Sequence, residues 1–143
     1  MNIMLDTNVI IDYIAVRQPW YLDVEQIWNR VLSGSDQGYV SASALTDIYY
    51  ITSRILDQTL ALKAVALCCN SLTICPVDRA TIMRALTMPG GDFEDNVVIA
   101  CAERELLDAI VTRNQKDFQH CTLPVYTPSD YLQLYNGAES DSL

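Results

Sequence analysis

The sequence predicts a single α/β domain, a three-layer α/β/α sandwich around a central parallel sheet of four to five strands. Short apolar segments with the length of buried strands alternate with longer segments whose apolar residues recur every three or four positions, the spacing of a helix. Strands that alternate with helices pair in parallel through right-handed crossovers, and helices then cover both faces of the sheet. The chain of 143 residues is 50% hydrophobic, which is enough for one core.

Two strand–helix units are predicted in the first half of the chain. Pro19 suits the first turn of a helix that Ser33-Gly34 ends, and Ser41 or Ser43 can cap the helix after the second strand. The elements expected here are a strand at residues 3–5, helices at 9–14 and 20–31, a strand at 38–40 and a helix at 45–51.

The second half of the chain continues the alternation. After Asp92 the apolar residues are too continuous for an exposed helix, so this helix is expected to be buried. Residues 137–143 are polar and acidic, and we expect a disordered tail, which leaves residues 1–136 as the domain. The elements expected here are helices at 60–68, 82–86 and 92–102, strands at 72–75, 109–112 and 125–126, and a short last helix from 128.

Acidic residues outnumber basic residues by 18 to 9, which gives a net charge of -9. Most of the surface should repel nucleic acid, so any chemistry on nucleic acid must be local. The N-terminus lacks the features of a signal peptide, and no apolar run approaches the roughly 20 residues that cross a bilayer, so we expect a cytoplasmic protein without a membrane partner. The five cysteines form no CxxC motif and are interpreted as reduced, buried thiols.

Polar groups follow or flank several of the predicted strands. Asp6 follows the first strand, Asp47 lies in the helix after the second, and Asp95 lies at the start of the buried helix. Asn114 and Asp117 follow the fourth strand. Because ligands of parallel sheets bind beyond the carboxyl ends of the strands, we expect these groups to face one crevice.

Each acid also has an ordinary explanation. Asp6 and Asp92 could cap helices, and Glu94 and Asp95 suit the positive end of a helix dipole. Asp47 is harder to explain in this way, because it lies on or beside an apolar helix face where an unpaired carboxylate is costly.

Taken together, the acids predict a divalent metal ion. Converging carboxylates raise one another's pKa unless a cation is present, and sets of oxygen ligands suit Mg²⁺ or Mn²⁺ better than Zn²⁺. Such an ion can activate a bound water and neutralise charge on a phosphorane-like transition state, so phosphodiester hydrolysis is the reaction that this site suits best. Arg113 and Lys116 are candidates for contacts with substrate phosphates, or are solvated turn residues. The candidate metal ligands are Asp6, Asp47, Asp92, Asp95, Asn114 and Asp117.

Other kinds of site lack their parts. His120 is the only histidine, so a catalytic triad would depend on it, and a histidine in a surface loop is the simpler interpretation. The sequence contains neither GxxxxGK[ST] nor GxGxxG, the usual nucleotide-binding loops. A phosphoacceptor receiver domain also places acids around Mg²⁺, but it normally has an aspartate after the third strand, where this chain has Pro76-Val77.

Four motifs resemble, in order, those of the PIN-domain nucleases. The resemblance covers residues 3–127, and its first and fourth motifs are the most specific. The motifs are Met4-Leu5-Asp6-Thr7-Asn8-Val9-Ile10-Ile11-Asp12, residues 41–50, Asp92-Phe93-Glu94-Asp95 with Ala100 and Ala102, and Val111-Thr112-Arg113-Asn114 with Lys116-Asp117-Phe118.

This resemblance implies an α/β/α sandwich, cleavage of single-stranded RNA that depends on Mg²⁺ or Mn²⁺, and a homodimer. Many small bacterial members are toxins of the VapC type, which an antitoxin holds inactive. The metal-binding acids would be Asp6, Asp47 and Asp95. Asp47 stands where Glu is commoner and Asn114 where a fourth Asp is often found, and Asp117 is a candidate to compensate for Asn114.

Two questions remain open at this point, the catalytic strength of the site and the oligomeric state. The chain could be a catalytically weak PIN-fold protein that acts by binding RNA or a protein partner, as the net charge and Asn114 favour. A homodimer is also suggested by an apolar excess that includes Trp20, Trp28 and the pair Tyr49-Tyr50, although both tryptophans could instead lie in the core.

Overall fold

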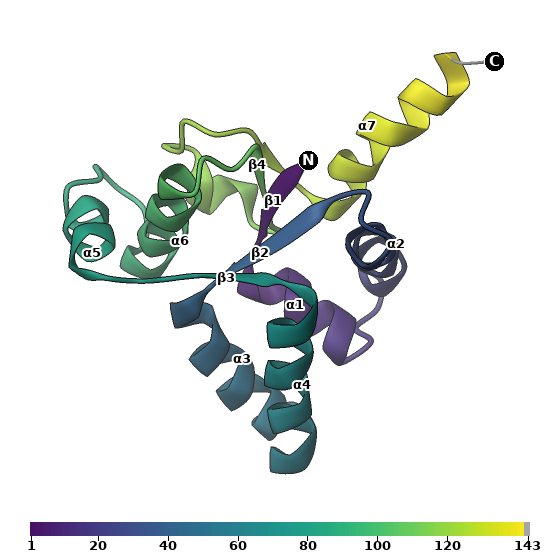
Figure 1. The fold of residues 1–143 in the computed structure, drawn as a ribbon, viewed down its shortest axis with the longest axis horizontal. Helices are drawn as coiled ribbons and strands as arrows, with labels where there is room; N and C mark the ends of the chain where they lie inside the picture. Colours follow the sequence, from purple (N-terminus) through teal and green to yellow (C-terminus); the bar gives the residue numbers. More distant parts are fainter. Residues whose placement is uncertain (142–143) are drawn as a thin grey trace.

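The computed structural model describes the backbone of residues 1–141 and the side chains of residues 1–136, which form a five-stranded parallel sheet with helices on both faces (Figure 1). This arrangement confirms the predicted α/β class and the number of strands. The elements in order are β1 (Asn2–Leu5), α1 (Thr7–Ile14), α2 (Tyr21–Leu32), β2 (Gln37–Ser41), α3 (Ala42–Ile55), α4 (Gln58–Ser71), β3 (Thr73–Cys75), α5 (Arg79–Leu86), α6 (Phe93–Arg104), β4 (Ala109–Val111), the 3-10 helix η1 (Gln115–Phe118), β5 (Val125–Tyr126) and α7 (Pro128–Asp141).

The strand order is β3-β2-β1-β4-β5, so the first strand of the chain lies in the centre of the sheet. Ile3 of β1 pairs with Gly38 of β2 on one side and with Ala109 of β4 on the other. The chain builds outward from β1 to β3 and then crosses to the opposite side of β1 to add β4 and β5. Sheets of this kind bind ligands where the direction of strand addition reverses, at the carboxyl ends of the strands.

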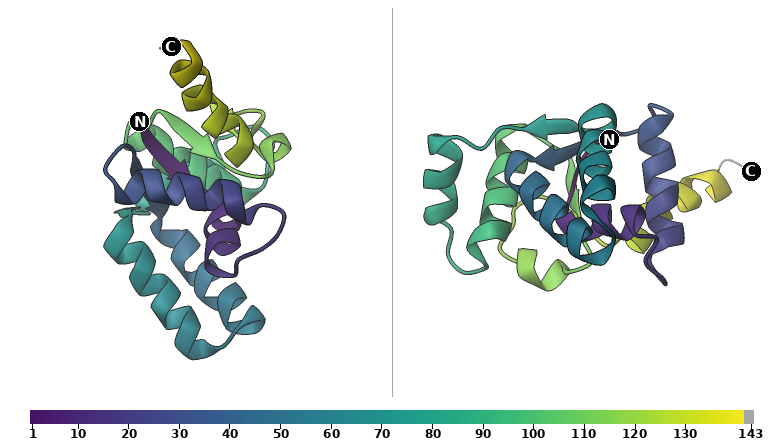
Figure 2. Two further views of the ribbon diagram at one scale, coloured as in Figure 1. Left: turned by 90° about the vertical axis from the view of Figure 1, so that its right-hand side faces the viewer. Right: turned by 90° about the horizontal axis from the view of Figure 1, so that it is seen from below.

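The core has two layers, one on each face of the sheet. Ile3 and Leu5 point into one layer and Met4 into the other, as expected from the two-residue period of a strand. The helices α1, α2, α3, α4 and α7 cover the first face, and α5 and α6 cover the second (Figure 2). Trp28 is 1% exposed in the first layer, whereas Trp20 is 37% exposed, so only one of the two tryptophans belongs to the core.

Helix α6 is the buried helix that the sequence predicts. Every residue from 96 to 102 is buried, because α6 lies between the sheet and α5. Its first turn carries Glu94 and Asp95, and its N-cap is Asp92. Gly90 and Gly91 precede this cap with positive φ angles, a conformation that suits glycine, so the chain can turn sharply into the helix. The start of α6 therefore meets the carboxyl edge of the sheet.

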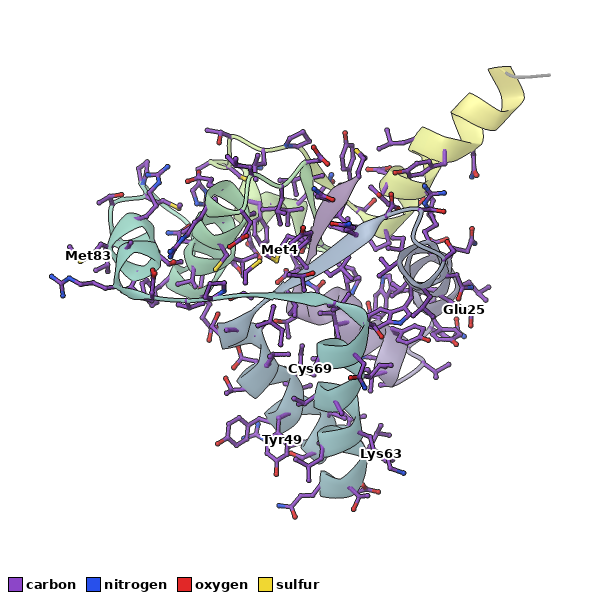
Figure 3. All side chains as sticks on the ribbon, in the orientation of Figure 1. Met4, Glu25, Tyr49, Lys63, Cys69 and Met83 are labelled. Carbon is purple, nitrogen blue, oxygen red and sulfur yellow. The ribbon has the colours of Figure 1, made fainter. Side chains whose placement is uncertain are left out.

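The helices α3 and α4 form a hairpin that extends away from the sheet (Figures 1 and 3). In Figure 3, Tyr49 and Lys63 lie in the outer half of this hairpin, and Cys69 lies closer to the sheet. The hairpin exposes several large apolar side chains, which are Tyr50, Ile51, Ile55, Leu56, Leu60 and Leu62.

Helix α7 is longer than the short last helix that the sequence predicts. Tyr131 and Tyr135 donate hydrogen bonds of 2.7 and 3.1 Å to the buried carboxylate of Asp36, which anchors α7 beside α2. Burial alone would raise the pKa of Asp36, but hydrogen bonds, that of Arg30 first, lower it to about 2. The predicted disordered tail, residues 137–143, overlaps this helix, whose backbone continues to Asp141. The last two residues of that tail lie outside the described part of the chain.

Two further sequence predictions concern the surface. Across residues 1–141, no helix is both long and apolar enough to cross a bilayer. All five cysteines are free, and Cys68, Cys75 and Cys101 are buried as predicted, with burial raising the pKa of each thiol. Cys69 is exposed and Cys121 is half-buried, so the prediction of buried thiols is wrong for Cys69.

Candidate metal-binding active site

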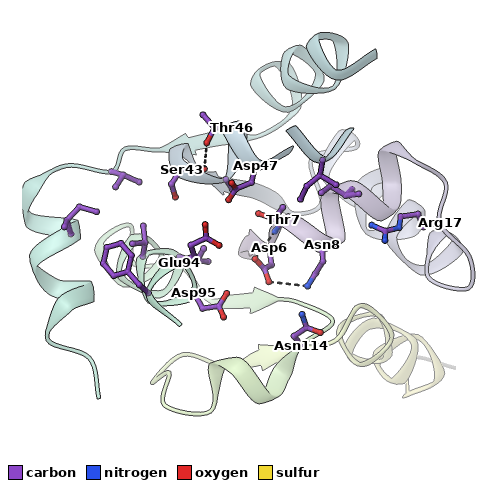
Figure 4. Close-up of a pocket in the computed structure, with 18 residues that line it drawn as sticks. Asp6, Thr7, Asn8, Arg17, Ser43, Thr46, Asp47, Glu94, Asp95 and Asn114 are labelled. Carbon is purple, nitrogen blue, oxygen red and sulfur yellow. Dashed lines mark hydrogen bonds between the residues drawn. The ribbon is translucent and has the colours of Figure 1, made fainter. Parts of the chain in front are cut away.

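A cleft of about 800 Å³ opens where the ends of β1 and β2 meet the start of α6 (Figure 4). It brings together the three acids predicted as the main metal ligands, Asp6, Asp47 and Asp95, with a fourth acid, Glu94. The remaining polar side chains of its lining are Thr7, Asn8, Arg17, Ser43, Thr46 and Asn114.

The side chain of Asp6, the first residue after β1, is held in one orientation. The hydroxyl of Thr112 donates a hydrogen bond of 2.8 Å to Oδ2, and the backbone N–H of Thr7 donates one of 2.9 Å to Oδ1. Asp6 is 8% exposed, and burial raises its pKa, although the two hydrogen bonds oppose this rise. A buried and oriented carboxylate with a raised pKa is stabilised in its charged form by a cation.

A hydrogen-bonded network links Asp6 to the segment after β4. The side-chain amide of Asn8 lies 3.5 Å from Asp6 Oδ2 and from Thr112 Oγ1. The backbone N–H of Arg113 donates to Asn8 Oδ1 at 3.3 Å, and that of Asn114 donates to Thr112 Oγ1 at 3.1 Å. Sequence reasoning assigned no role to Asn8 or Thr112. Their place inside the first and fourth motifs was the signal that could have identified them.

Glu94 and Asp95, in the first turn of α6, face Asp6 and Asp47 across the cleft (Figure 4). Burial and then neighbouring negative charges, that of Asp6 first, together raise the pKa of Asp95 to about 7. The negative charge of Asp47 is the main cause that raises the pKa of Glu94. The sequence analysis placed Glu94 in the third motif and at the helix dipole, but did not include it among the candidate metal ligands. In the structure it belongs to the same cluster of mutually repelling carboxylates.

The other candidate ligands take different positions. Asn114 lines the cleft. Asp117 is exposed in η1 and does not line it, but its negative charge raises the pKa of both Asp6 and Asp95. Asp92 also lies outside the lining, and its Oδ1 caps α6 by accepting a hydrogen bond of 2.7 Å from a backbone N–H. Asp92 therefore has the capping role that the sequence offered as its alternative.

Neither of the predicted phosphate contacts lines the cleft. Arg113 forms an ion pair with the buried Asp12, with 2.7 Å between Nε and Oδ2, and its guanidinium stacks 3.8 Å from the ring centre of Trp20. This environment favours a structural role for Arg113, and its contact with phosphate stays a prediction. Lys116 is exposed in η1. The basic residue that does line the cleft is Arg17, which sequence reasoning did not select.

His120 lies apart from the cleft lining. Its Nε2 is 2.6 Å from Oδ1 of Asn96, whose amide in turn donates to the carbonyl of Gly90 at 3.0 Å. These contacts connect the loop after η1 to the turn before α6. They agree with the interpretation of His120 as a loop histidine rather than a catalytic one.

The cleft fits a hard divalent cation by its donor chemistry. Its carboxylate and amide oxygens are the ligands that Mg²⁺ and Mn²⁺ prefer, and the raised pKa values of Asp6, Glu94 and Asp95 record repulsion and burial that a cation would relieve. Among the side chains of residues 1–136, no three carboxylate, thiol or imidazole groups are close enough to hold a metal ion as they stand. An ion bound here would require the acids to draw together around it.

Residues 2–116 match the family described as PIN domain. The chain belongs to this family. The match covers β1 to β4 and includes the four acids of the cleft and Asn114, but it ends one residue before Asp117. The resemblance drawn from the four motifs is thereby confirmed.

Individual relatives of this PIN domain share its length and fold. The chain is 26% identical over 140 residues to Ribonuclease VapC1 of Aquifex aeolicus, covering 94% of this chain and 96% of that protein. Its fold is similar to that of a chain in the DNA-bound VapBC structure of Salmonella typhimurium, with a TM-score of 0.69, 20% identity, and coverage of 90% and 98% of the two chains. It is also similar to VapC20 of Mycobacterium tuberculosis, described as a toxin that cleaves the sarcin-ricin loop, with a TM-score of 0.63, 14% identity, and coverage of 76% and 86%.

Proposed function

We propose that this PIN domain is a ribonuclease that uses Mg²⁺ or Mn²⁺ to hydrolyse phosphodiester bonds of single-stranded RNA. The observation that carries the proposal is the convergence of Asp6, Asp47, Glu94 and Asp95 on one cleft at the switch point of the sheet. Four carboxylates without an ion would repel one another, so the cluster is explained best by a function that uses a cation.

Each acid has a distinct part in this proposal. Asp6, Asp47 and Asp95 would hold the ion, which supplies an activated water and neutralises charge on the phosphate. Thr112 fixes Asp6 so that one carboxylate oxygen is directed by a hydrogen bond before the ion binds. Glu94 adds negative charge to the cluster. Its role is to strengthen the attraction for the cation.

A toxin role is the second part of the proposal. It is supported by the similarity to Ribonuclease VapC1 and by similarity in fold to VapC20 and to a chain of the VapBC structure. We infer that a separate antitoxin protein binds this chain and blocks the cleft. A small open reading frame directly upstream would be the genetic sign of such a partner.

The rival proposal is a catalytically weak PIN domain that acts by binding RNA or a protein. Asn114 favours this rival, because it lines the cleft with an amide where many family members have an acid, and so does the net charge of -9. The two proposals differ in a simple assay. Purified protein would be incubated with single-stranded and duplex RNA in Mn²⁺, in Mg²⁺ or in EDTA.

The ribonuclease proposal expects slow cleavage of the single strand in either metal and none in EDTA. The rival expects that RNA stays intact in every buffer while binding is still detected. Cleavage that continues in EDTA would contradict both.

A further inference from the structure

The cleft has one basic and one aromatic side chain among the residues that line it, Arg17 and Phe93. Arg17 belongs to the loop between α1 and α2, and Phe93 is the first residue of α6. In Figure 4, Arg17 lies on the opposite side of Asp6 from Glu94 and Asp95. Phe93 directly precedes these two acids in α6. Arg17 and Phe93 therefore belong to different elements, each of them next to the acidic cluster.

We propose that the cleft binds a single strand of RNA with a backbone phosphate on Arg17 and an unpaired base stacked on Phe93. This inference rests on the proposed ribonuclease function and extends it by assigning the residues that hold the substrate. The carboxylates repel RNA, because RNA is a polyanion. Contacts outside the acidic cluster must therefore supply the affinity for RNA.

Arg17 is free to bind a phosphate because Asp12 has another partner. Its Nε lies 3.8 Å from Asp12 Oδ1, and its side chain is 40% exposed. Arg113 lies much closer to the same carboxylate, with 2.7 Å between its Nε and Oδ2 and a hydrogen bond of 3.3 Å that its Nη2 donates to Oδ1. Arg17 can therefore turn toward a ligand without leaving Asp12 unpaired. A guanidinium suits this task, because it binds phosphate through two parallel hydrogen bonds.

Phe93 has the exposure that a stacking surface requires. It is 48% exposed although the later residues of its own helix, α6, are buried, and the cleft also contains the apolar side chains of Ile51, Val77 and Ile82. A base can stack on an exposed ring of this kind only when it is not paired in a duplex. Phe93 would thus give the site a preference for single strands that the acidic cluster alone cannot provide.

Fluorescence anisotropy with a short labelled RNA tests this assignment. The binding of single-stranded and duplex RNA would be measured over a range of salt concentrations in EDTA, which prevents metal-dependent cleavage, for the wild type and for Arg17→Ala, Phe93→Leu and Phe93→Trp. The matched controls are Arg79→Ala and Met83→Ala, which remove an exposed arginine and an exposed apolar side chain outside the cleft. Circular dichroism would verify that each variant is folded.

Arg17→Ala should weaken RNA binding. The slope of the logarithm of the binding constant against the logarithm of the salt concentration should fall in magnitude by about 1, the value for one phosphate contact. Phe93→Leu should weaken binding of the single strand by about tenfold with little change in that slope. Phe93→Trp keeps an aromatic ring and should bind the single strand as tightly as the wild type does. Both controls should bind like the wild type. Unchanged affinity in Arg17→Ala or in Phe93→Leu would overturn the proposal. So would a Phe93→Leu variant that loses only self-association or binding to a protein partner.

The same variants separate this inference from the proposed function. If the wild type binds RNA, the two cleft variants weaken that binding, and no RNA is cut in any metal, then the substrate contacts stand and the ribonuclease proposal fails. If the wild type cuts RNA in Mn²⁺ and both cleft variants bind and cut equally well, the substrate contacts fail alone. A wild type that neither binds RNA in EDTA nor cuts it in Mn²⁺ or Mg²⁺ would overturn both.

Discussion

The carboxylate of Asp12 and the guanidinium of Arg113 form an ion pair between α1 and the segment after β4, with 2.7 Å between Oδ2 and Nε. Asp12 is completely buried, and burial raises its pKa, while the positive charges of Arg113 and then Arg17 oppose the rise. The ion pair holds in place the segment that carries Thr112, the residue that orients Asp6. Arg113 therefore has a structural role next to the candidate site.

Removing Arg113 should destabilise the protein. Loss of one partner from a buried ion pair costs about 3–5 kcal/mol, and because Arg113 is 22% exposed and Arg17 remains near Asp12, we expect about 3 kcal/mol for Arg113→Ala. Urea denaturation gives the free energy of unfolding, with Arg79→Ala as the exposed control. An Arg113→Ala variant as stable as this control, but with weaker RNA binding, would restore the phosphate contact that the sequence predicts.

Metal-free stability should fall as pH rises through the pKa of Asp95. This pKa is about 7 in the folded protein against the ordinary value of 3.8 for an aspartate side chain, so the folded state binds more protons than the unfolded state between these pH values. The contribution of Asp95 therefore favours the folded state at acid pH, and it is lost as pH rises toward 7. Asp95→Asn should be more stable than the wild type above about pH 7 in EDTA, because it removes a buried negative charge from the cluster.

Thermal denaturation in EDTA across this pH range measures the effect, with Asp130→Asn, an exposed acid at the start of α7, as the control. If the wild type and Asp95→Asn respond to pH in the same way, Asp95 does not titrate as described.

The amide at position 114 should make metal binding weaker than a carboxylate would. Asn114 lines the cleft and can offer a carbonyl oxygen but no negative charge, so Asn114→Asp should tighten Mn²⁺ binding. Asp117 is close enough for its charge to raise the pKa of Asp6 and Asp95, so Asp117→Ala should weaken it. Calorimetric titration with Mn²⁺ measures the metal affinity of both variants and of the wild type. If both variants bind like the wild type, the segment after β4 is not part of the metal site.

A homodimer is expected from the family and from the apolar surface of the α3–α4 hairpin. Tyr50 is 62% exposed and Leu62 is 63% exposed, and neither is used by the fold. Trp28 no longer supports this prediction, because it lies in the core. Light scattering at high protein concentration should give twice the mass of the chain, and Leu62→Glu should shift this mass toward the monomer. A monomeric wild type would refute the prediction.

The sequence was sufficient for the architecture and for the main acids of the site. Buried strands and helices differ in apolar spacing, and parallel strands bring their carboxyl ends to one edge, so the meeting of Asp6, Asp47 and Asp95 follows from the order of the elements. The role of Arg113 could not be predicted in this way. It depends on Asp12, which lies 101 positions away in the chain and is brought close only by packing of α1 against the sheet. The orientation of Glu94 and the length of α7 likewise depend on tertiary contacts.

Cleavage of single-stranded RNA in Mn²⁺ by the wild type and by Asp6→Asn is the most direct test of the central claim. Asp6→Asn keeps the size of the side chain and can still accept hydrogen bonds from Thr112 and Thr7, but it removes the charge that would bind the ion. We predict that the folded variant loses most of the activity, by about 100-fold or more, as expected when a group that stabilises the transition state through several kcal/mol is lost. An Asp6→Asn variant that cuts as fast as the wild type would contradict the metal-dependent mechanism.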